Sequence, residues 1–207
     1  NATADTVEHV VYAVGEHQKA ELFVELIERD NWFKVLVFTS TKRQADELKI
    51  KLKEAGIKAG ISHGDKSQGS RRRALADFKS DKIQVLISTE IAARGLDIQG
   101  LDYVVNYNLP YLPEDYVHRI GRTGRAGNKG QAISFVSREE ERALNSIEQL
   151  IGYKIKRISM KGYEVGNRDV LFENIKTTSR PARSNKASQI KNIHKKADKT
   201  KTGKKKR

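Results

Sequence analysis

Short runs of apolar and β-branched residues alternate along most of the chain with longer segments of helical period. KVLVFTS at residues 34–40 is followed by KRQADELKIKLKEAG, and IQVLIST at 83–89 by EIAARG. Runs such as VLVF and VLIS are continuously apolar, which is typical of strands covered on both faces. The sequence therefore predicts an α/β fold, a doubly wound parallel sheet sandwiched by helices.

Polar or glycine-rich segments follow the predicted strands. They are residues 38–41, 62–68, 88–97 and 107–110, together with the turn after the predicted helix that contains His118. In parallel α/β sheets, ligands bind at the carboxyl ends of the strands. We therefore expect the functional side chains to lie in these segments.

The segment HRIGRTGRAG at 118–127 interrupts a run of arginines with glycines. Gly121 suits the C-terminal cap of a helix, so the basic residues divide between the last helical turn (His118 and Arg119) and the loop beyond it (Arg122 and Arg125). Two guanidiniums on such a loop can form forked hydrogen bonds to phosphate oxygens. A patch that binds the RNA backbone, or a set of surface ion pairs, would also explain them.

STEIAARGLDI at 88–98 turns out of an apolar strand at Thr89. The Thr89 hydroxyl can donate to a phosphate, and the carboxylate of Asp97 can accept from ribose hydroxyls. Taken alone, Arg94 and Asp97 around Gly95 are equally typical of a local turn closed by a salt bridge.

SQGSRRRALADFK at 67–79 predicts a helix opened by Gln68 and Arg71. The amides and dipole at a helix N-terminus favour an anion. A capped amphipathic helix with a solvated basic face is the alternative.

The sequence lacks several motifs that nucleotide-hydrolysing and metal-dependent enzymes use. It has no GxxxxGK[ST] phosphate loop, no acidic metal motif after a strand and no cysteine, so we expect no metal site. His63 and His118 could act as bases, but a lone histidine is more often hydrogen-bonded structure. We expect that the chain does not hydrolyse a nucleoside triphosphate unaided.

In this order, the segments resemble the C-terminal RecA-like domain of DEAD-box ATP-dependent RNA helicases. VLVFTST is similar to motif IV, QGSR to motif IVa, STEIAARGLD to motif V and HRIGRTGRAG to motif VI. The resemblance covers residues 6–160 and is strongest to the RhlE-type bacterial subgroup. It implies a RecA-like sheet and, in the whole protein, ATP-driven local unwinding of RNA.

The resemblance implies a nucleotide role for several residues. Arg122 and Arg125 would be catalytic arginine fingers that reach the γ-phosphate of ATP, and Gly95 and Asp97 would complete the nucleotide site, with Asp97 at the ribose. ATP and Mg²⁺ would be bound mainly by an N-terminal RecA-like domain outside this chain. Contact with that domain would come from three residues: Arg94, His118 and Arg119.

The resemblance also assigns RNA contacts at the strand ends. The residues are Thr41, Gly64, Gln68, Arg71 and Thr89. Two positions depart from the family pattern, since Glu90 and Asn108 stand where aspartate is usual. Glu90 keeps the negative charge on a longer side chain, so the sequence does not decide whether it makes the short capping bond that an aspartate would make. Asn108 removes a negative charge near the interdomain cleft.

The positive charge of the chain is concentrated at its C-terminus. Residues 176–207 carry 13 Lys or Arg and one acid, Asp198, and so account for +12 of the formal +14. We expect a RecA-like domain over residues 1–160 and a basic, largely disordered extension over 161–207. This extension either binds RNA or only solubilises the protein.

The chain begins at Asn1 and contains no run of about 18 apolar residues. We expect a piece of a longer cytoplasmic protein that has no membrane partner. The sequence does not predict an oligomeric state. A stand-alone module that binds RNA or protein, without ATPase activity, is the alternative to a helicase domain.

Overall fold

The computed structural model describes residues 6–124 and 129–163. The chain divides into two units, Asn1–Thr177 and Thr178–Arg207, and every described residue belongs to the first. The predicted basic extension lies outside the described residues except for positions 161–163, so its disorder and its boundary stay predictions.

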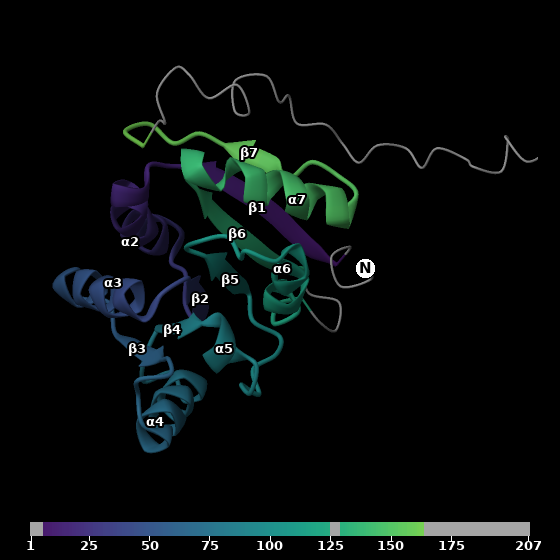
Figure 1. Cartoon of the computed structure of the whole chain (residues 1–207). Coiled ribbons are helices and arrows are strands. Elements are labelled where there is room, and N and C mark those ends of the chain that lie inside the picture. The colour runs from purple at the N-terminus through teal and green to yellow at the C-terminus, as the bar shows by residue number, and fades with distance from the viewer. Residues whose placement is uncertain (1–5, 125–128, 164–207) are drawn as a thin grey trace, which may run out of the picture. The chain divides into compact units, whose positions relative to one another are not determined.

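Seven parallel strands form one sheet in the order β3-β4-β2-β5-β6-β1-β7 (Figure 1). Their bounds are β1 Val7–Ala13, β2 Val35–Thr39, β3 Ala59–Ser62, β4 Val85–Thr89, β5 Tyr103–Asn106, β6 Gly130–Val136 and β7 Lys156–Ile158. The predicted α/β fold with a parallel sheet is confirmed. The edge strand β7 was not predicted, because its three residues lie in a polar segment and only its pairing with β1 makes it a strand.

Helices connect the strands. Their bounds are η1 Glu16–Gln18, α2 Lys19–Asp30, α3 Lys42–Glu54, α4 Gln68–Lys79, α5 Glu90–Ala93, α6 Pro113–Ile120, η2 Arg138–Glu140 and α7 Glu141–Ile151. Pro113 is the first residue of α6, and Gly121 is its C-cap. The helix predicted before the arginine loop is thus confirmed at both ends.

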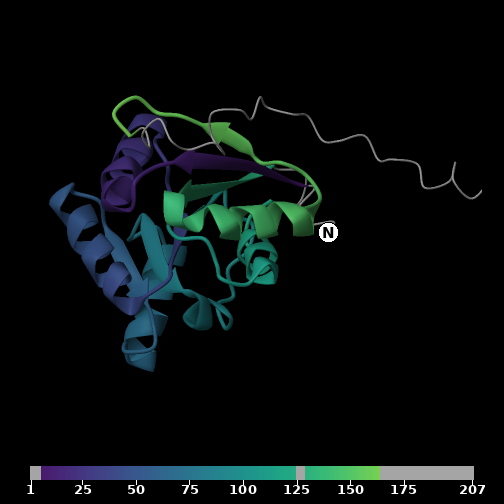
Figure 2. The ribbon, with the colours of Figure 1, turned by 45° about the horizontal axis from the view of Figure 1, so that its top comes forward.

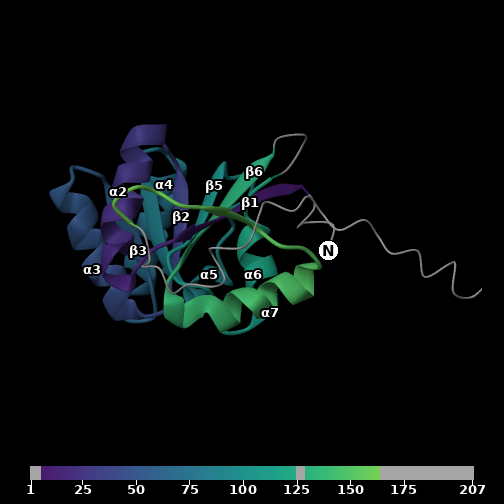
Figure 3. The same ribbon diagram turned by 90° about the horizontal axis from the view of Figure 1, so that it is seen from above.

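Strand β2 shows how both faces of the sheet are buried. Val35 and Val37 pack into the cluster that includes α2 and α3, whereas Leu36 and Phe38 pack into the cluster on the other face with α4 and α5. Successive side chains of a strand point to opposite faces, so this four-residue apolar run at 35–38 needs cover on both sides. Figure 3 shows α2 and α7 on opposite sides of the sheet.

The half of the sheet around β1 and β6 is covered by α6 and α7. Val11 and Val136 pack with Leu144 and Ile147 of α7, and Tyr116 of α6 joins the same buried cluster. In Figure 2, α7 crosses in front of these strands. Burial of this apolar surface fixes α6, and with it the position from which residues 121–124 continue.

Strand register aligns the predicted functional segments at one edge. Thr39 of β2 pairs with Thr89 of β4, and Phe38 pairs with Asn106 of β5. Ser62 of β3 pairs with Ser88. Because all the strands are parallel, the segments that follow these residues leave the sheet at the same edge, as expected.

Candidate functional site

Thr41 caps the start of α3 directly after β2. Its hydroxyl accepts a hydrogen bond from the backbone N–H of Gln44 at 3.1 Å, and the Gln44 side chain accepts one from the Thr41 N–H at 3.1 Å. This reciprocal pair is a capping box, which satisfies amides that have no partner within the helix. Thr41 is exposed, so it combines a fixed backbone with an accessible hydroxyl.

His63 holds the loop between β3 and α4. Its buried ring accepts the Asp65 backbone N–H at Nδ1 (3.2 Å), which leaves Nε2 to donate to Asp46 Oδ1 at 3.3 Å. Both ring nitrogens therefore make structural hydrogen bonds, which fits the interpretation of His63 as a structural residue and not as a base. Gly64 lies inside this loop, and a Cβ there would come within 3.3 Å of the Lys42 side chain.

Helix α4 begins at Gln68, as predicted, and Ser67 is its N-cap. The Ser67 hydroxyl accepts from the Ser70 N–H at 3.1 Å, and Gln68 is exposed. Arg71 is half-buried, and its Nε has no hydrogen-bond partner among the described residues. A phosphate at this helix start would give that donor a partner.

The predicted site residues at and after the end of β4 differ in exposure. Thr89 is the buried last residue of β4 and precedes α5 without capping it through its side chain. Gly95 has open space around it, since a Cβ there would meet no atom within 4 Å. The Asp97 side chain is 95% exposed, and its carboxylate lies 3.8 Å from Lys79 Nζ. Such an exposed pair holds the carboxylate only weakly.

Arg119 lies inside the domain and not on its surface. Its side chain is 3% exposed, and its guanidinium donates to the Glu90 carboxylate, to Asn106 Oδ1 at 3.0 Å and to the Asn108 carbonyl at 2.8 Å. Burial lowers the pKa of Arg119, and the Glu90 carboxylate acts in the opposite direction. The direct contact with another domain that we expected of Arg119 does not match this geometry, because the group is bonded within its own domain.

Glu90 uses its longer arm for this bond. Its Oε2 accepts from Arg119 Nε across 29 positions of sequence. Glu90, which replaces the usual aspartate, thus forms an ion pair with Arg119 of motif VI. This pair links the start of α5 to the end of α6.

Arg94 and His118 are exposed basic residues of the site. Their side chains are 68% and 74% exposed, and both approach Asp115 Oδ1, Arg94 Nη2 at 3.8 Å and His118 Nδ1 at 3.7 Å. Asp115, on the first turn of α6, thus lies close to both side chains, which are exposed where a partner domain could reach them.

Arg122 is half-buried and held by backbone carbonyls. Its guanidinium donates to Leu96 O at 2.7 Å and to Ala93 O at 3.5 Å. Ala93 is the last residue of α5 and Leu96 lies just beyond it, so Arg122 of motif VI is hydrogen-bonded to the motif V segment. Arg125 lies outside the described residues, and its predicted role stays a prediction.

Motifs V and VI together line an open surface pocket of about 650 Å³. Its lining includes Glu90, Arg94, Gln99, His118 and Arg122. Gln99 was not predicted, because it stands in a loop outside the motif pattern. The RNA-contact candidates Thr41, Gly64, Gln68 and Arg71 are not part of this lining. Of the predicted nucleotide residues that the structure describes, Arg122 is part of the lining, whereas Gly95 and Asp97 are not.

Comparison with known proteins now decides the family. The helicase conserved C-terminal domain matches residues 18–127, more than half of the chain. The chain belongs to the helicase conserved C-terminal domain family. The RecA-like prediction is therefore confirmed together with the sheet.

The helicase domain is similar to DEAD-box proteins. It is 44% identical over 155 residues to the ATP-dependent RNA helicase RhlB of Pseudomonas aeruginosa, which covers 75% of this chain and 39% of that protein. The C-terminal domain of the DEAD-box protein Dbp5 matches with a TM-score of 0.70 and 36% identity, over 75% of this chain and 92% of that one. Dbp5 of S. cerevisiae bound to RNA and ADP BeF3 matches with a TM-score of 0.69 and 36% identity, over 75% and 42%.

The chain thus spans about two fifths of the length of the curated relative RhlB. The expected placement in the RhlE-type subgroup is not tested by these likenesses and stays a prediction.

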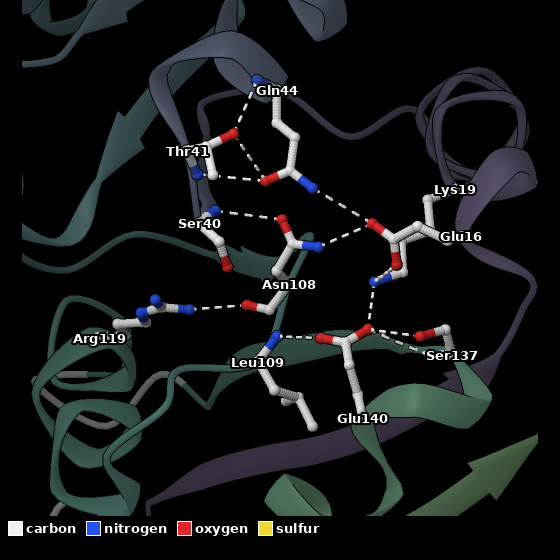
Figure 4. Close-up of polar contacts among 10 residues, drawn as sticks. All are labelled: Glu16, Lys19, Ser40, Thr41, Gln44, Asn108, Leu109, Arg119, Ser137 and Glu140. Atoms are coloured by element: carbon white, nitrogen blue, oxygen red, sulfur yellow. Dashed lines mark hydrogen bonds and ion pairs between the residues drawn. The ribbon is translucent and has the colours of Figure 1, made fainter.

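A buried polar network beside motif VI was missed from the sequence (Figure 4). Fully buried Lys19 pairs with Glu16 Oε2 at 2.8 Å and with Glu140, whose other oxygen accepts the Leu109 N–H at 2.7 Å. The Asn108 side chain donates to Glu16 Oε1 at 2.9 Å and so belongs to the same network. The only signal in the sequence was Asn108 itself, a departure from the family pattern.

Within residues 6–124 and 129–163, no group of three or more His, Cys, Asp or Glu could hold a metal ion. A search of the same residues finds no helix long and apolar enough to cross a membrane.

Proposed function

We propose that this chain is the C-terminal RecA-like domain of a DEAD-box ATP-dependent RNA helicase, which couples ATP hydrolysis to local unwinding of RNA. The observation that carries the proposal is Arg122, which lines a surface pocket between motifs V and VI, in a sequence that has no phosphate-binding loop. The greater length of RhlB supports an N-terminal RecA-like domain that supplies the remainder of the site.

In the nucleotide site, Arg122 and Arg125 are the arginine fingers. The guanidinium of Arg122 exchanges the carbonyls of Leu96 and Ala93 for the γ-phosphate when the N-terminal domain presents ATP. There it stabilises the charge that develops in the transition state, and it is a catalytic residue in this sense. Asp97, with its exposed carboxylate, accepts from the ribose, and Gly95 leaves room for the nucleotide.

The N-terminal domain holds Mg²⁺ and most of the ATP. Arg94 and His118 face that domain, since both are exposed beside Asp115. Arg119 contributes indirectly, because its buried bonds fix the end of α6 from which Arg122 follows.

RNA binds along the other part of the same edge. Thr41, Gly64, Gln68, Arg71 and Thr89 contact phosphates and sugars. Hydroxyls, loop backbone and a helix N-terminus recognise the backbone and carry little sequence information, so base specificity is low. The similarity to Dbp5 bound to RNA supports this assignment.

The remaining assignments follow the sequence. Residues 1–160 form the RecA-like domain of a cytoplasmic protein of the RhlE type, and residues 161–207 form a basic extension that tethers RNA.

The test is the ATPase activity of the full-length protein with Arg122→Ala. RNA-stimulated turnover falls by about 10³-fold or more, as for arginine fingers isolated in other enzymes, while RNA affinity stays within about twofold, since phosphate contacts elsewhere carry binding. Arg142→Ala, which removes an exposed arginine on α7, is the matched control and leaves turnover unchanged. Full ATPase activity in Arg122→Ala would contradict the proposal.

A further inference from the structure

Asn108 lies between the RNA part of the edge and motif VI. Asn108 follows β5 and is only 6% exposed. Figure 4 shows its bonds to Ser40 and to Arg119. Asn108 Oδ1 accepts the Ser40 backbone N–H at 3.1 Å, and its own carbonyl accepts from Arg119 Nη1 at 2.8 Å. One residue therefore contacts both the segment before Thr41 and the helix before Arg122.

The orientation of the Asn108 amide follows from its partners. The Ser40 N–H can only donate, so the amide oxygen faces Ser40 and the amide nitrogen faces Glu16, to whose Oε1 it donates at 2.9 Å. Asparagine can make both bonds at once. An aspartate could accept from Ser40 but could not donate to Glu16, and it would set two carboxylates against each other.

Both carboxylate oxygens of Glu16 have partners in this structure, although its side chain is 46% exposed. Its Oε2 lies 2.8 Å from the Nζ of fully buried Lys19, and its Oε1 also accepts from Gln44 Nε2 at 3.3 Å. Gln44 is the capping partner of Thr41. Glu16 thus meets the α3 cap by two routes, directly through Gln44 and through Asn108 and Ser40.

The loop at Asn108 and Leu109 is also held by a charged pair, Lys19 and Glu140. Lys19 also pairs with Glu140, and Glu140 accepts the backbone N–H of Leu109, the residue after Asn108. A displacement of the α3 cap would reach this loop through Ser40, and the loop is itself bonded to Arg119 and to Glu140 by buried and partly buried hydrogen bonds, which are costly to leave unmade.

We propose that Asn108, paired with Glu16, is a positioning residue that couples RNA contact at Thr41 to the motif VI segment that carries Arg122. The proposal rests on the proposed function of the chain as a helicase domain. It also explains why asparagine stands at a position where the resembling family usually has aspartate: the donor that Glu16 requires comes only from the amide.

The experiment measures ATP hydrolysis by the full-length protein, with and without a saturating single-stranded RNA, in variants at these two positions. Asn108→Asp lowers the RNA-stimulated kcat by about tenfold, an effect typical of coupled neighbours, while the KM for ATP and the turnover without RNA stay within about twofold. Adding Glu16→Gln to Asn108→Asp restores RNA stimulation to within about threefold of wild type, because the glutamine amide donates to the new carboxylate.

Asn31→Asp is the matched control. It makes the same chemical change at an exposed position at the end of α2 and leaves RNA stimulation unchanged. If Asn108→Asp is too unstable to purify, Asn108→Ala removes both side-chain bonds without adding charge and gives the same selective loss of stimulation.

The outcomes separate the coupling from the helicase assignment. Wild-type protein without RNA-stimulated hydrolysis overturns the proposed function and the coupling together. RNA stimulation that survives in Asn108→Asp overturns the coupling alone. So does an equal loss of turnover with and without RNA, accompanied by a lower melting temperature, because that result shows a structural role only.

Discussion

Different kinds of contact stabilise the part of the sheet edge that we propose binds RNA and the part that we propose binds the nucleotide, called the RNA part and the nucleotide part below. At the RNA part, caps formed within three residues close the helix starts, Thr41 with Gln44 and Ser67 with Ser70. At the nucleotide part, Arg119 and Arg122 bind groups far away in sequence, as when Arg122 donates to Leu96 O. The helix caps of the RNA part are therefore formed locally, although Ser40 and Gln44 also have long-range partners, whereas the nucleotide part depends on the folded sheet.

This difference has a consequence for how the domain works. The caps that Thr41 and Ser67 form leave the starts of α3 and α4 already ordered, so the residues proposed to contact RNA there would be preorganised. Arg122 must exchange its bonds to two carbonyls before it can bind a phosphate. The nucleotide part is thus completed only when another domain offers the phosphate, and a defect there should act on turnover more than on RNA affinity.

The largest effect is expected from Glu90→Ala, which breaks the nucleotide part. It leaves the buried guanidinium of Arg119 without its carboxylate, and the loss of one partner of a buried ion pair destabilises a fold by about 3–5 kcal/mol. Thermal and urea unfolding measure this loss. Glu90→Gln keeps an acceptor and should lose clearly less; equal stability of Glu90→Ala and wild type would show that Arg119 does not need the pair.

Thr41→Ala tests the local construction of the RNA part. Loss of the cap lowers the free energy of unfolding by about 1 kcal/mol and weakens RNA binding, which a fluorescence titration measures. Thr41→Ser retains the hydroxyl and serves as the control. Ser67→Ala removes the α4 cap and should cost about the same; a much larger loss in either variant would mean that the RNA part is not locally stabilised.

Deletion of residues 176–207 should weaken RNA binding and flatten its salt dependence. Each phosphate neutralised on a single strand contributes a slope of about 0.7 in log K against log salt. Titration at several salt concentrations measures the slope. If the slope does not change, the extension serves solubility only.

The smallest effect is expected from the exposed pair of Lys42 and Asp65 beside Gly64, 2.6 Å apart. Its hydrogen bond to Lys42 lowers the pKa of Asp65 below 3.8. A lowered pKa in the folded state adds stability above about pH 4 that is lost as the pH falls through the folded value. Asp65→Asn should make unfolding slightly less dependent on pH below 4; an unchanged acid profile would show that the pair contributes nothing.

Local features of this domain could be predicted from the sequence, and long-range ones could not. The apolar run at 35–38 and the glycine at 121 determine a strand and a helix end by themselves. The burial of Arg119 depends on Glu90, 29 residues earlier, and the burial of Lys19 on Glu140, 121 residues later. The arginines of motif VI can be identified in the sequence, but the sequence does not show that Arg119 is the buried one.

The central claim is that this chain holds half of a nucleotide site. The most direct test is steady-state ATP hydrolysis by purified residues 1–207 with saturating RNA, compared with the full-length protein under the same conditions. The account predicts RNA-stimulated turnover in the full-length protein and none above background in the chain alone. Substantial hydrolysis by the chain alone would contradict it.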